Sequence, residues 1–564
     1  MVKIMANIAV DEDQGHDSIQ PYGMHVSSRY LDLTRRKLEL TRLPRELQLP
    51  NSRRWEYGTP KAVLEPLIDF WYVSSALKVR NLCETLNALH LTYNAIRLKR
   101  YDWRTQEALF NNALPQFRTT IRTPGHSSLA GSELTGTQPA HSPLRVHFVH
   151  KRSKHRNAIP LLFCHGWPSS FIELYKIVDA LTDPVSLPSY GIGAQQAFHV
   201  VAPSIPGFGF SDASPVEGFG LRGTAGAFDE VMSRLGYAKR GYVVHGAGWG
   251  FKICRALALY YPQHCLAVHT TNPSLPQPTM RRDPMVYLKY QIASFTHAKF
   301  SYLNFGYVPA DFAPAPQTLK NTQSNELGAS GGGFDASDAA LASQYSQRSQ
   351  TVSYSLCDSP IGLLACMLDA LHSRSAGSTF SLSQSPFLPL SELSQQASQQ
   401  ASRKASQQPA TVDNEVELQI QPAPPAQIVL SPWHSETNGQ DYTWAPTEIL
   451  SWTMMQWLPG PEAGLRWLKQ ASHDSSHANP AFWETYSTVP LGISQFRPTR
   501  GSTESPLMWA ETVQNLAWAK RHPRSARWPA WEAPDLLVLD LRECFGGWVE
   551  SGVVRVARDD AEDN

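Results

Sequence analysis

The sequence predicts an α/β protein built on a mostly parallel sheet. Two apolar runs, IPLLFC at 159–164 and FHVVAP at 198–203, each end in a turn and are followed by helix-compatible sequence. A third unit begins at residue 241, where an apolar strand, a glycine-rich turn and an amphipathic helix follow one another in GYVVHGAGWGFKICRALALYYP. Strands that alternate with helices in this order are typical of parallel sheets.

The remaining elements follow from periodicity. Residues 20–122 alternate a polar helical pattern, LDLTRRKLELTRLP, with aromatic stretches, which indicates a helical or irregular lead segment. LRVHFVHK at 144–151 and PLGISQF at 490–496 have strand patterns. Helices are expected at 359–371, 445–458 and 533–545, where the sequence is apolar or amphipathic.

Composition limits the class of partner. The chain has 564 residues, of which 42% are hydrophobic and 18% charged, so it can bury a large core. Fifty Lys and Arg stand against 49 Asp and Glu, giving a net charge of +1 without any basic run. This balance argues against a nucleic-acid partner and favours a neutral small molecule or a protein. The sequence leaves the oligomeric state open.

Targeting and cysteine patterns point to an intracellular protein. The first residues turn acidic before any signal peptide could form, and no segment approaches 18 uninterrupted apolar residues, so we expect no membrane-spanning segment. We expect a cytoplasmic location, with peripheral membrane association through the lead segment left open. The seven cysteines are dispersed without CxxC pairs, which predicts buried thiols rather than disulfides or a zinc site. We expect neither a cofactor nor a metal.

Composition shifts also divide the chain. Two stretches near 317–347 and 373–427 are rich in Ser, Gln and Gly and are expected to be loops within a lid. The expected divisions are a disordered tail at 1–19, a lead domain at 20–142, a core at 143–274 and 481–555, a lid at 275–480, and a tail at 556–564.

Two glycine-containing turns carry the candidate site. His165, Gly166, Trp167 and Pro168 follow an apolar strand, and such a turn can present backbone N–H groups to a developing oxyanion. We nevertheless favour a turn-fixing role for the His165 and Trp167 side chains. The segment GAGWG at 246–250 has the spacing of a nucleophile elbow, in which flanking glycines permit a strained turn. Its central residue is a glycine, so the elbow pattern lacks a nucleophilic side chain.

These motifs resemble those of one family. The chain is similar to the epoxide hydrolases of the α/β-hydrolase superfamily, specifically the microsomal and juvenile-hormone-type branch with its N-terminal domain. The resemblance implies an α/β-hydrolase fold with a mostly parallel sheet, a helical lid and an N-terminal lead domain. It also implies an activity that converts apolar epoxides to diols. The matching stretches include LELTRLP, YDWRTQEALFNNALPQFRTTI, LRVHFVHKRS, HGWPSSFIELYKIVDALTDP, AFHVVAPSIPGFGFSDAS, HGAGWG, DSPIGLLACMLDAL, PLGISQF and WEAPDLLVLDLRECF.

The resemblance further implies a two-step mechanism. An aspartate at the elbow opens the epoxide to an ester, two lid tyrosines protonate the leaving oxygen, and a histidine–acid pair activates water. The family's GGDWG falls on 246–250 and places Gly248 at the nucleophile position. The family's histidine falls on Arg527 in SARWPAWEAPDLL. Arginine stays protonated and cannot act as a general base. The oxyanion donors would be the backbone N–H groups of Trp167 and Trp249.

The acid and tyrosine positions also depart from the family pattern. Thr499 occupies the acid position, although Glu504 is near enough for a shifted loop to supply a carboxylate. The first lid tyrosine falls on Leu341, with Tyr345 one helical turn away as a displaced substitute. The second tyrosine falls on Leu468.

These departures favour a pseudoenzyme that binds an apolar small molecule without hydrolysing it. Two alternatives stay open. In the first, the chain is an active hydrolase or cyclase that uses substitute residues such as Glu504 or His245, although a histidine at a strand end is more often a hydrogen-bonded core residue. In the second, residues 78–98 and 123–142 are retained intron sequence, and the chain has no selected function.

Overall fold

The computed structural model describes ten parts of the chain. These are residues 18–50, 53–72, 101–124, 141–187, 189, 191–312, 347–372, 442–476, 479–497 and 505–556. The expected Ser/Gln-rich stretch at 373–427, almost all of the one at 317–347 and nearly all of both expected tails lie outside these residues, as do most of the segments at 78–98 and 123–142.

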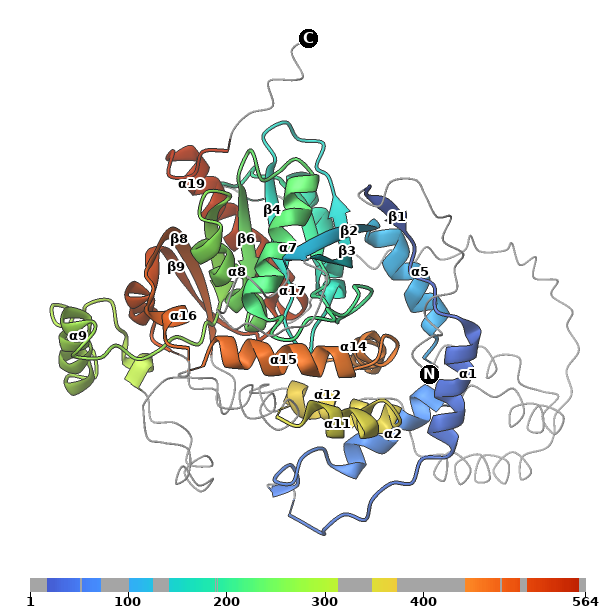
Figure 1. Cartoon of the computed structure of the whole chain (residues 1–564). Coiled ribbons are helices and arrows are strands. Elements are labelled where there is room, and N and C mark those ends of the chain that lie inside the picture. Colours follow the sequence, from blue (N-terminus) through green and yellow to red (C-terminus); the bar gives the residue numbers. More distant parts are fainter. Residues whose placement is uncertain are drawn as a thin grey trace, which may run out of the picture.

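A twisted nine-stranded sheet forms the centre of the molecule, in the order β1-β2-β3-β5-β4-β6-β7-β8-β9 (Figure 1). Six neighbouring strands, from β5 to β9, are parallel, which confirms the predicted α/β fold class. They are β5 (Phe198–Pro203), β4 (Ile159–Cys164), β6 (Tyr242–Gly246), β7 (Cys265–Thr271), β8 (Ser487–Arg497) and β9 (Gln514–Ser525). Strands β4, β5 and β6 are buried along their whole length, because helices cover both faces of the sheet.

The other edge of the sheet is antiparallel and comes partly from the lead segment. β1 (Gln20–Tyr22) pairs with β2 (Gln116–Pro124), β2 with β3 (His141–Lys151), and β3 with β5. The sequence pattern did not predict β2, because QFRTTIRT carries polar residues on one side and was grouped with the helical segment before it. The lead segment therefore contributes strands to the core sheet.

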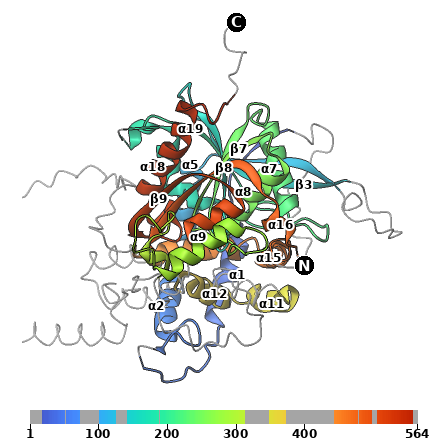
Figure 2. The same ribbon diagram turned by 90° about the vertical axis from the view of Figure 1, so that its left-hand side faces the viewer.

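Helices pack on both faces of the sheet. One face carries α7 (Leu221–Arg234) and α8 (Trp249–Tyr260), which pack against each other. The other face carries α6 (Val178–Thr182) and a continuous helical run of α18 (Pro534–Leu541), a π turn (Arg542–Gly546) and α19 (Gly547–Glu550), as Figure 2 shows. α5 (Trp103–Ala113) begins at Asp102, whose carboxylate accepts hydrogen bonds from the Arg104 and Thr105 backbone N–H groups.

A second layer of helices lies across the carboxyl ends of the parallel strands. It consists of α11 (Ser349–Leu356), α12 (Pro360–His372), α14 (Pro446–Trp457) and α15 (Glu462–Asp474), with α1 (Ser28–Glu39) and α2 (Lys61–Tyr72) packed beneath it (Figure 1). Helix α9 (Pro284–Phe295) projects to one side. The helices predicted at 359–371, 445–458 and 533–545 are confirmed by α12, α14 and α18 with the π turn. Short segments complete the fold: 3-10 turns at Phe171–Lys176, Pro184–Ser186, Pro309–Phe312 and Leu507–Thr512, and helices α16 (Ala481–Glu484) and α17 (Pro529–Glu532).

The structure also tests the expectations about membrane-spanning segments and cysteines. Among the described residues, no single helix could span a membrane, although α11 and α12 together pass that test while bending by 115° between them. Six cysteines lie in the described part, and all are free thiols. Four are buried as expected, but Cys357 is exposed at the end of α11 and Cys366 in α12 is half-buried, which corrects the prediction for these two residues.

Candidate functional site

The glycine-rich turn between β6 and α8 has the geometry of a nucleophile elbow. Gly248 lies between the strand and the helix with φ 54° and ψ −116°, a conformation that L-residues rarely adopt. A Cβ built on Gly248 would meet no atom within 4 Å, and the residue is exposed. The turn therefore leaves open space at the position where the family places its nucleophile.

The HGWP turn packs directly against this elbow. A Cβ on Gly166 would lie 3.2 Å from the Ala247 carbonyl oxygen and 3.6 Å from the Trp249 backbone nitrogen. A Cβ on Gly250 would lie 2.0 Å from the Cys164 carbonyl oxygen. The two turns that the sequence singled out are thus brought together at the carboxyl ends of neighbouring strands β4 and β6, with glycines allowing the close approach.

His165 has two backbone partners that fix the HGWP turn. Its Nδ1 lies 2.9 Å from the Gly166 carbonyl oxygen, and its Nε2 accepts a hydrogen bond from the Ile205 N–H at 3.1 Å. Burial lowers the pKa of His165 to about 4, so the ring is neutral at neutral pH. These contacts support the turn-fixing role for His165. Trp167 is half-buried, and its bond to Pro168 is cis.

Two lid helices cover the turns. Gln456 of α14 donates hydrogen bonds from Nε2 to the Pro168 and Ser169 carbonyl oxygens at 3.1 and 3.2 Å. Trp467 of α15 contacts Trp249 edge-to-face, with ring centroids 6.1 Å apart, and donates from Nε1 to the Thr224 hydroxyl at 2.8 Å. The wall beside the elbow is therefore aromatic and is held in place by hydrogen bonds from the lid to the core.

A separate hollow of about 90 Å³ lies between the lead helices and α14. Leu31, Thr34, Trp71, Tyr101 and Met454 are among the residues that line it. None of the predicted site residues does, so this hollow is distinct from the elbow.

Arg527 sits in the turn after β9, at the position implied for the general base. Its guanidinium carbon lies 4.6 Å above the Trp528 ring, and its backbone N–H donates to Glu532 Oε2 at 2.6 Å. The Trp528 N–H donates to the same oxygen at 2.9 Å, so one carboxylate fixes the whole turn. A guanidinium in this place supplies positive charge but cannot accept a proton from water.

A pair of buried carboxylates lies next to Arg527, and the motif analysis did not single them out. Burial raises the pKa of Glu173 to about 7, and the charge of Glu532 adds to the rise, whereas a hydrogen bond from Ser169 and the charge of Arg527 oppose it. Burial also raises the pKa of Glu532. Their sequence signal was a lone acidic residue inside each of two apolar stretches, FIELY and WEAP. Buried carboxylates with raised pKa values are typical of functional sites, although structural pairs share the property.

The other predicted site residues divide between buried positions and positions outside the described residues. Leu468 is fully buried in α15, next to the lid residue Trp467. Thr499, Glu504, Leu341 and Tyr345 fall on residues that the structure does not describe. Their assigned positions therefore stay predictions.

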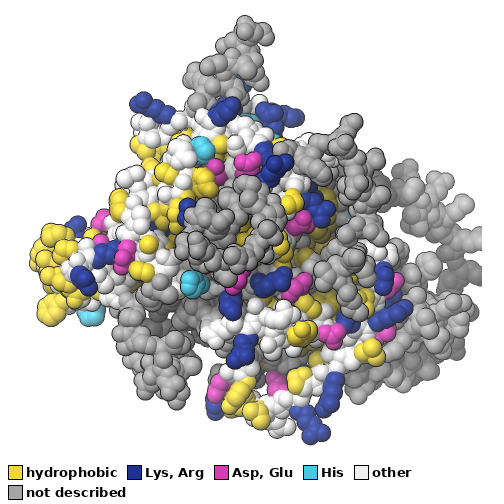
Figure 3. All heavy atoms as spheres, viewed as in Figure 1, with side chains coloured by type: hydrophobic (Ala, Val, Ile, Leu, Met, Phe, Trp, Pro, Cys, Tyr) yellow, Lys and Arg dark blue, Asp and Glu magenta, His cyan; other side chains and the backbone are white. Residues whose placement is uncertain are grey.

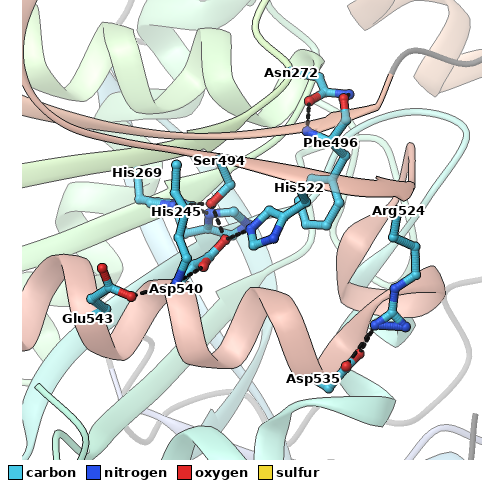
Figure 4. Close-up of polar contacts among 11 residues, drawn as sticks. His245, His269, Asn272, Ser494, Phe496, His522, Arg524, Asp535, Asp540 and Glu543 are labelled. Atoms are coloured by element: carbon cyan, nitrogen blue, oxygen red, sulfur yellow. Dashed lines mark hydrogen bonds and ion pairs between the residues drawn. The ribbon is translucent and has the colours of Figure 1, made fainter. Parts of the chain in front are cut away.

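A chain of buried polar groups crosses the sheet beneath α18 (Figure 4). His245 Nδ1 lies 3.0 Å from His269 Nδ1, and His269 Nε2 lies 3.1 Å from the Ser494 hydroxyl. Ser494 donates to Asp540 Oδ2 at 2.5 Å, and His522 Nε2 lies 2.6 Å from the same oxygen. Burial lowers the pKa of His245 to about 3. A neutral, fully buried histidine bonded to a second histidine is a structural group, as expected for a strand-end histidine.

Asp540 anchors this chain, so its replacement should destabilise the fold. Asp540 is fully buried and also pairs with Lys520 at 3.3 Å. We expect Asp540→Asn to lower the free energy of unfolding by about 2–4 kcal/mol, because it disrupts a buried hydrogen-bond network through Ser494 and His522 and removes the ion pair with Lys520. Urea unfolding would measure the change. The matched control is Asp535→Asn on the same helix, whose two carboxylate oxygens both accept from Arg524 Nη2; this half-exposed ion pair should contribute about 1 kcal/mol or less. Equal losses in both variants would contradict this assignment.

Buried histidines predict a loss of stability below neutral pH. Burial depresses their folded-state pKa values, so between about pH 4 and 6.5 the unfolded chain binds protons that the folded chain does not, and stability falls as the pH falls. Glu173 acts in the opposite direction between about pH 4.5 and 7, because its folded pKa is raised. The histidines are His147, His150, His165, His245 and His269.

The expected result is a free energy of unfolding that drops by several kcal/mol from pH 7 to pH 5, since each histidine contributes up to about 1.4 kcal/mol per pH unit. Urea titrations at half-unit intervals would measure it. Glu173→Gln removes the opposing contribution and should steepen the dependence by about 1 kcal/mol per pH unit. A flat profile, or an unchanged slope in the variant, would contradict the burial of these groups.

Among the residues that the structure describes, no group of three or more His, Cys, Asp or Glu side chains could hold a metal ion.

Comparison with known proteins shows a similarity to epoxide hydrolases. The family model for the epoxide hydrolase N terminus matches residues 19–174, and the model for the alpha/beta hydrolase fold matches residues 159–296. A protein of Stigmatella aurantiaca named "Putative epoxide hydrolase" is 26% identical over 533 residues, covering 93% of this chain and 84% of that protein. Epoxide hydrolase 1 of Sus scrofa is 30% identical over 45% of this chain, but the match spans only 44% of that protein's length. Juvenile hormone epoxide hydrolase 1 of Ctenocephalides felis is 29% identical, and the match spans 43% of its length.

Solved structures show the same fold. An epoxide hydrolase of Aspergillus niger superposes with a TM-score of 0.55 at 20% identity, covering 95% of this chain and 96% of that one. Juvenile hormone epoxide hydrolase from the silkworm Bombyx mori superposes with a TM-score of 0.59 at 18% identity, with the same coverage. The fold, the two matching family models and the paired turns agree: the chain has the α/β-hydrolase fold and is similar to epoxide hydrolases over most of its length.

Proposed function

We propose that this chain binds an apolar small molecule at the elbow and does not hydrolyse it. The observation that carries the proposal is Gly248, which occupies the turn between β6 and α8 with open space at its Cβ position and has no side chain of its own. In the family mechanism that turn carries the aspartate that attacks the epoxide. Without a nucleophile the covalent ester cannot form, and losing one such group lowers rates by about 10⁴–10⁶.

Other positions of the family pattern support the same proposal. Arg527 holds the position of the general base and is permanently charged. Leu468 holds a position where the family has a proton-donating tyrosine, and its buried side chain has no proton to give. The features of the family pattern that this chain retains are ones that can bind a ligand. They are the backbone turns at Trp167 and Trp249 and the aromatic wall that Trp467 completes.

A residual hydrolase or cyclase that uses substitute groups is the second candidate. The burial of His245 against His269 argues against that histidine as a replacement base, because it reaches neither the elbow surface nor water. Glu173 favours this candidate, because a carboxyl group with a pKa of about 7 can act as a general acid or a general base at neutral pH.

The test combines binding with product analysis on the full chain. Styrene oxide and a long-chain terminal epoxide are incubated with the purified protein, diol and rearranged products are measured by mass spectrometry, and binding is followed by tryptophan fluorescence. We expect saturable binding with no product above the uncatalysed rate. Trp467→Phe should weaken binding, whereas Trp548→Phe, a buried tryptophan of α19, should not. Diol formation by the unmodified chain would overturn the proposal, and so would a complete absence of binding.

A further inference from the structure

Helix α9 and the residues that flank it expose apolar side chains to solvent. Phe295 is 90% exposed, and the neighbouring large apolar residues are at least half exposed. Figure 3 shows them as a yellow cluster on the projecting part of the molecule. The cluster, which we call the α9 patch, consists of Met280, Met285, Leu288, Phe295, Phe300 and Tyr302. Contiguous exposed apolar side chains of this kind mark interaction sites rather than ordinary surface.

The helical period separates an inner from an outer face of α9. Tyr290 and Ala293 face inward: Ala293 is fully buried, and the Tyr290 ring lies 5.5 Å from that of Trp509. Met285, Leu288 and Phe295 are spaced by three and seven residues and therefore share the opposite, outer face. The helix is thus anchored by one apolar face while a second apolar face has no covering among the described residues.

Basic residues surround the patch. Between residues 280 and 302 the chain carries four arginines and lysines against one aspartate, within a protein whose net charge is only +1. Arg282 is used internally, donating to the Trp483 and Thr512 carbonyl oxygens. Arg281 and Lys299 are exposed at the two ends of the patch, and Lys289 is half-exposed beside it. The α9 patch therefore combines apolar insertion residues with local positive charge.

The size of the patch favours a lipid surface over a second copy of the chain. Twelve helical residues span about 18 Å, and one helix face offers far less than the roughly 800 Å² that each partner contributes to a standard protein interface. An interfacial helix needs no such area, because its apolar side chains enter the boundary between headgroups and acyl chains, while neighbouring cations attract anionic lipids.

We propose that the α9 patch docks this protein onto an anionic phospholipid membrane surface. The proposal rests on exposure and charge, and it does not depend on the proposed function.

Co-sedimentation of the full chain with phospholipid vesicles tests the proposal. We expect binding to vesicles of phosphatidylcholine with about one third phosphatidylserine, and weaker binding to phosphatidylcholine alone or in high salt. Phe295→Ser should reduce the partition coefficient about tenfold or more, and Lys299→Ala about fivefold. Because both side chains are exposed, the melting temperature should stay unchanged.

The matched controls are Leu40→Ser, at an 84% exposed leucine of the lead segment, and Lys154→Ala, at an exposed lysine away from the patch. Neither should change partitioning. Three results would overturn the proposal: no binding to anionic vesicles, an equal loss in Leu40→Ser and Phe295→Ser, or a dimer in sedimentation velocity that Phe295→Ser converts to a monomer. The last result would assign the patch to a second copy of the chain. Epoxide binding is measured separately, without vesicles. A failure of membrane docking can therefore be told apart from a failure of the proposed small-molecule binding.

Discussion

Replacing Gly250 by alanine is expected to prevent folding, whereas the same change two residues earlier should be tolerated. A Cβ on Gly250 would lie 2.0 Å from the Cys164 carbonyl oxygen and 3.2 Å from that of His165. Those atoms belong to the end of β4 and the HGWP turn, which are buried and cannot withdraw. We expect Gly250→Ala to destabilise the protein by more than about 4 kcal/mol.

Gly248→Ala is the matched control, because it adds the same methyl group to the same turn. No atom lies within 4 Å of the new Cβ, so the change should cost only the backbone strain of φ 54° and ψ −116°, about 1–3 kcal/mol. Thermal melts and soluble yield would separate the two variants. A soluble, cooperatively folding Gly250→Ala protein would show that the elbow and the HGWP turn are not packed as described.

The sequence predicted the parts of the fold that depend on local pattern. The parallel strands and the elbow could be read from runs such as GYVVHGAGWG, since alternation and glycine spacing are local signals. β2 was missed because QFRTTIRT has no apolar run and becomes a strand only by pairing with β3. A strand whose partner comes later in the chain leaves little trace in its own sequence.

In the candidate site, too, only the features with a local sequence pattern could be predicted. Gly248 and the HGWP turn were found because both motifs are contiguous. Glu173 and Glu532 were missed because their pairing next to Arg527 joins segments that lie far apart in the chain. No local pattern encodes which buried acidic residues meet, and only the packing of the 3-10 turn Phe171–Lys176 against α17 brings them together. The exposure of α9 was equally invisible, since an apolar helix is by default a buried one.

Restoring a carboxylate at the elbow is expected to convert this protein into one that reacts covalently with an epoxide. In Gly248→Asp the new carboxylate would attack an epoxide carbon, the carbon–oxygen bond would open, and the alkoxide would take up a proton, leaving an ester of the mass of protein plus epoxide. With Arg527 unable to activate water, the ester should persist. Intact-mass spectrometry after incubation with styrene oxide would detect it.

The control variant is Gly248→Asn, which has nearly the same shape and backbone strain but no nucleophile, and it should remain unmodified. Adding Arg527→His to Gly248→Asp should shorten the lifetime of the ester and release diol, since a histidine can accept the proton of the attacking water. If the Gly248→Asp protein folds but is not modified by the epoxide, residue 248 does not occupy the family's nucleophile position. The expected pair of results is a stable ester in Gly248→Asp and ester hydrolysis in the Gly248→Asp, Arg527→His double variant. Together they would show that hydrolysis was lost at these two side chains and that the epoxide pocket around them is intact.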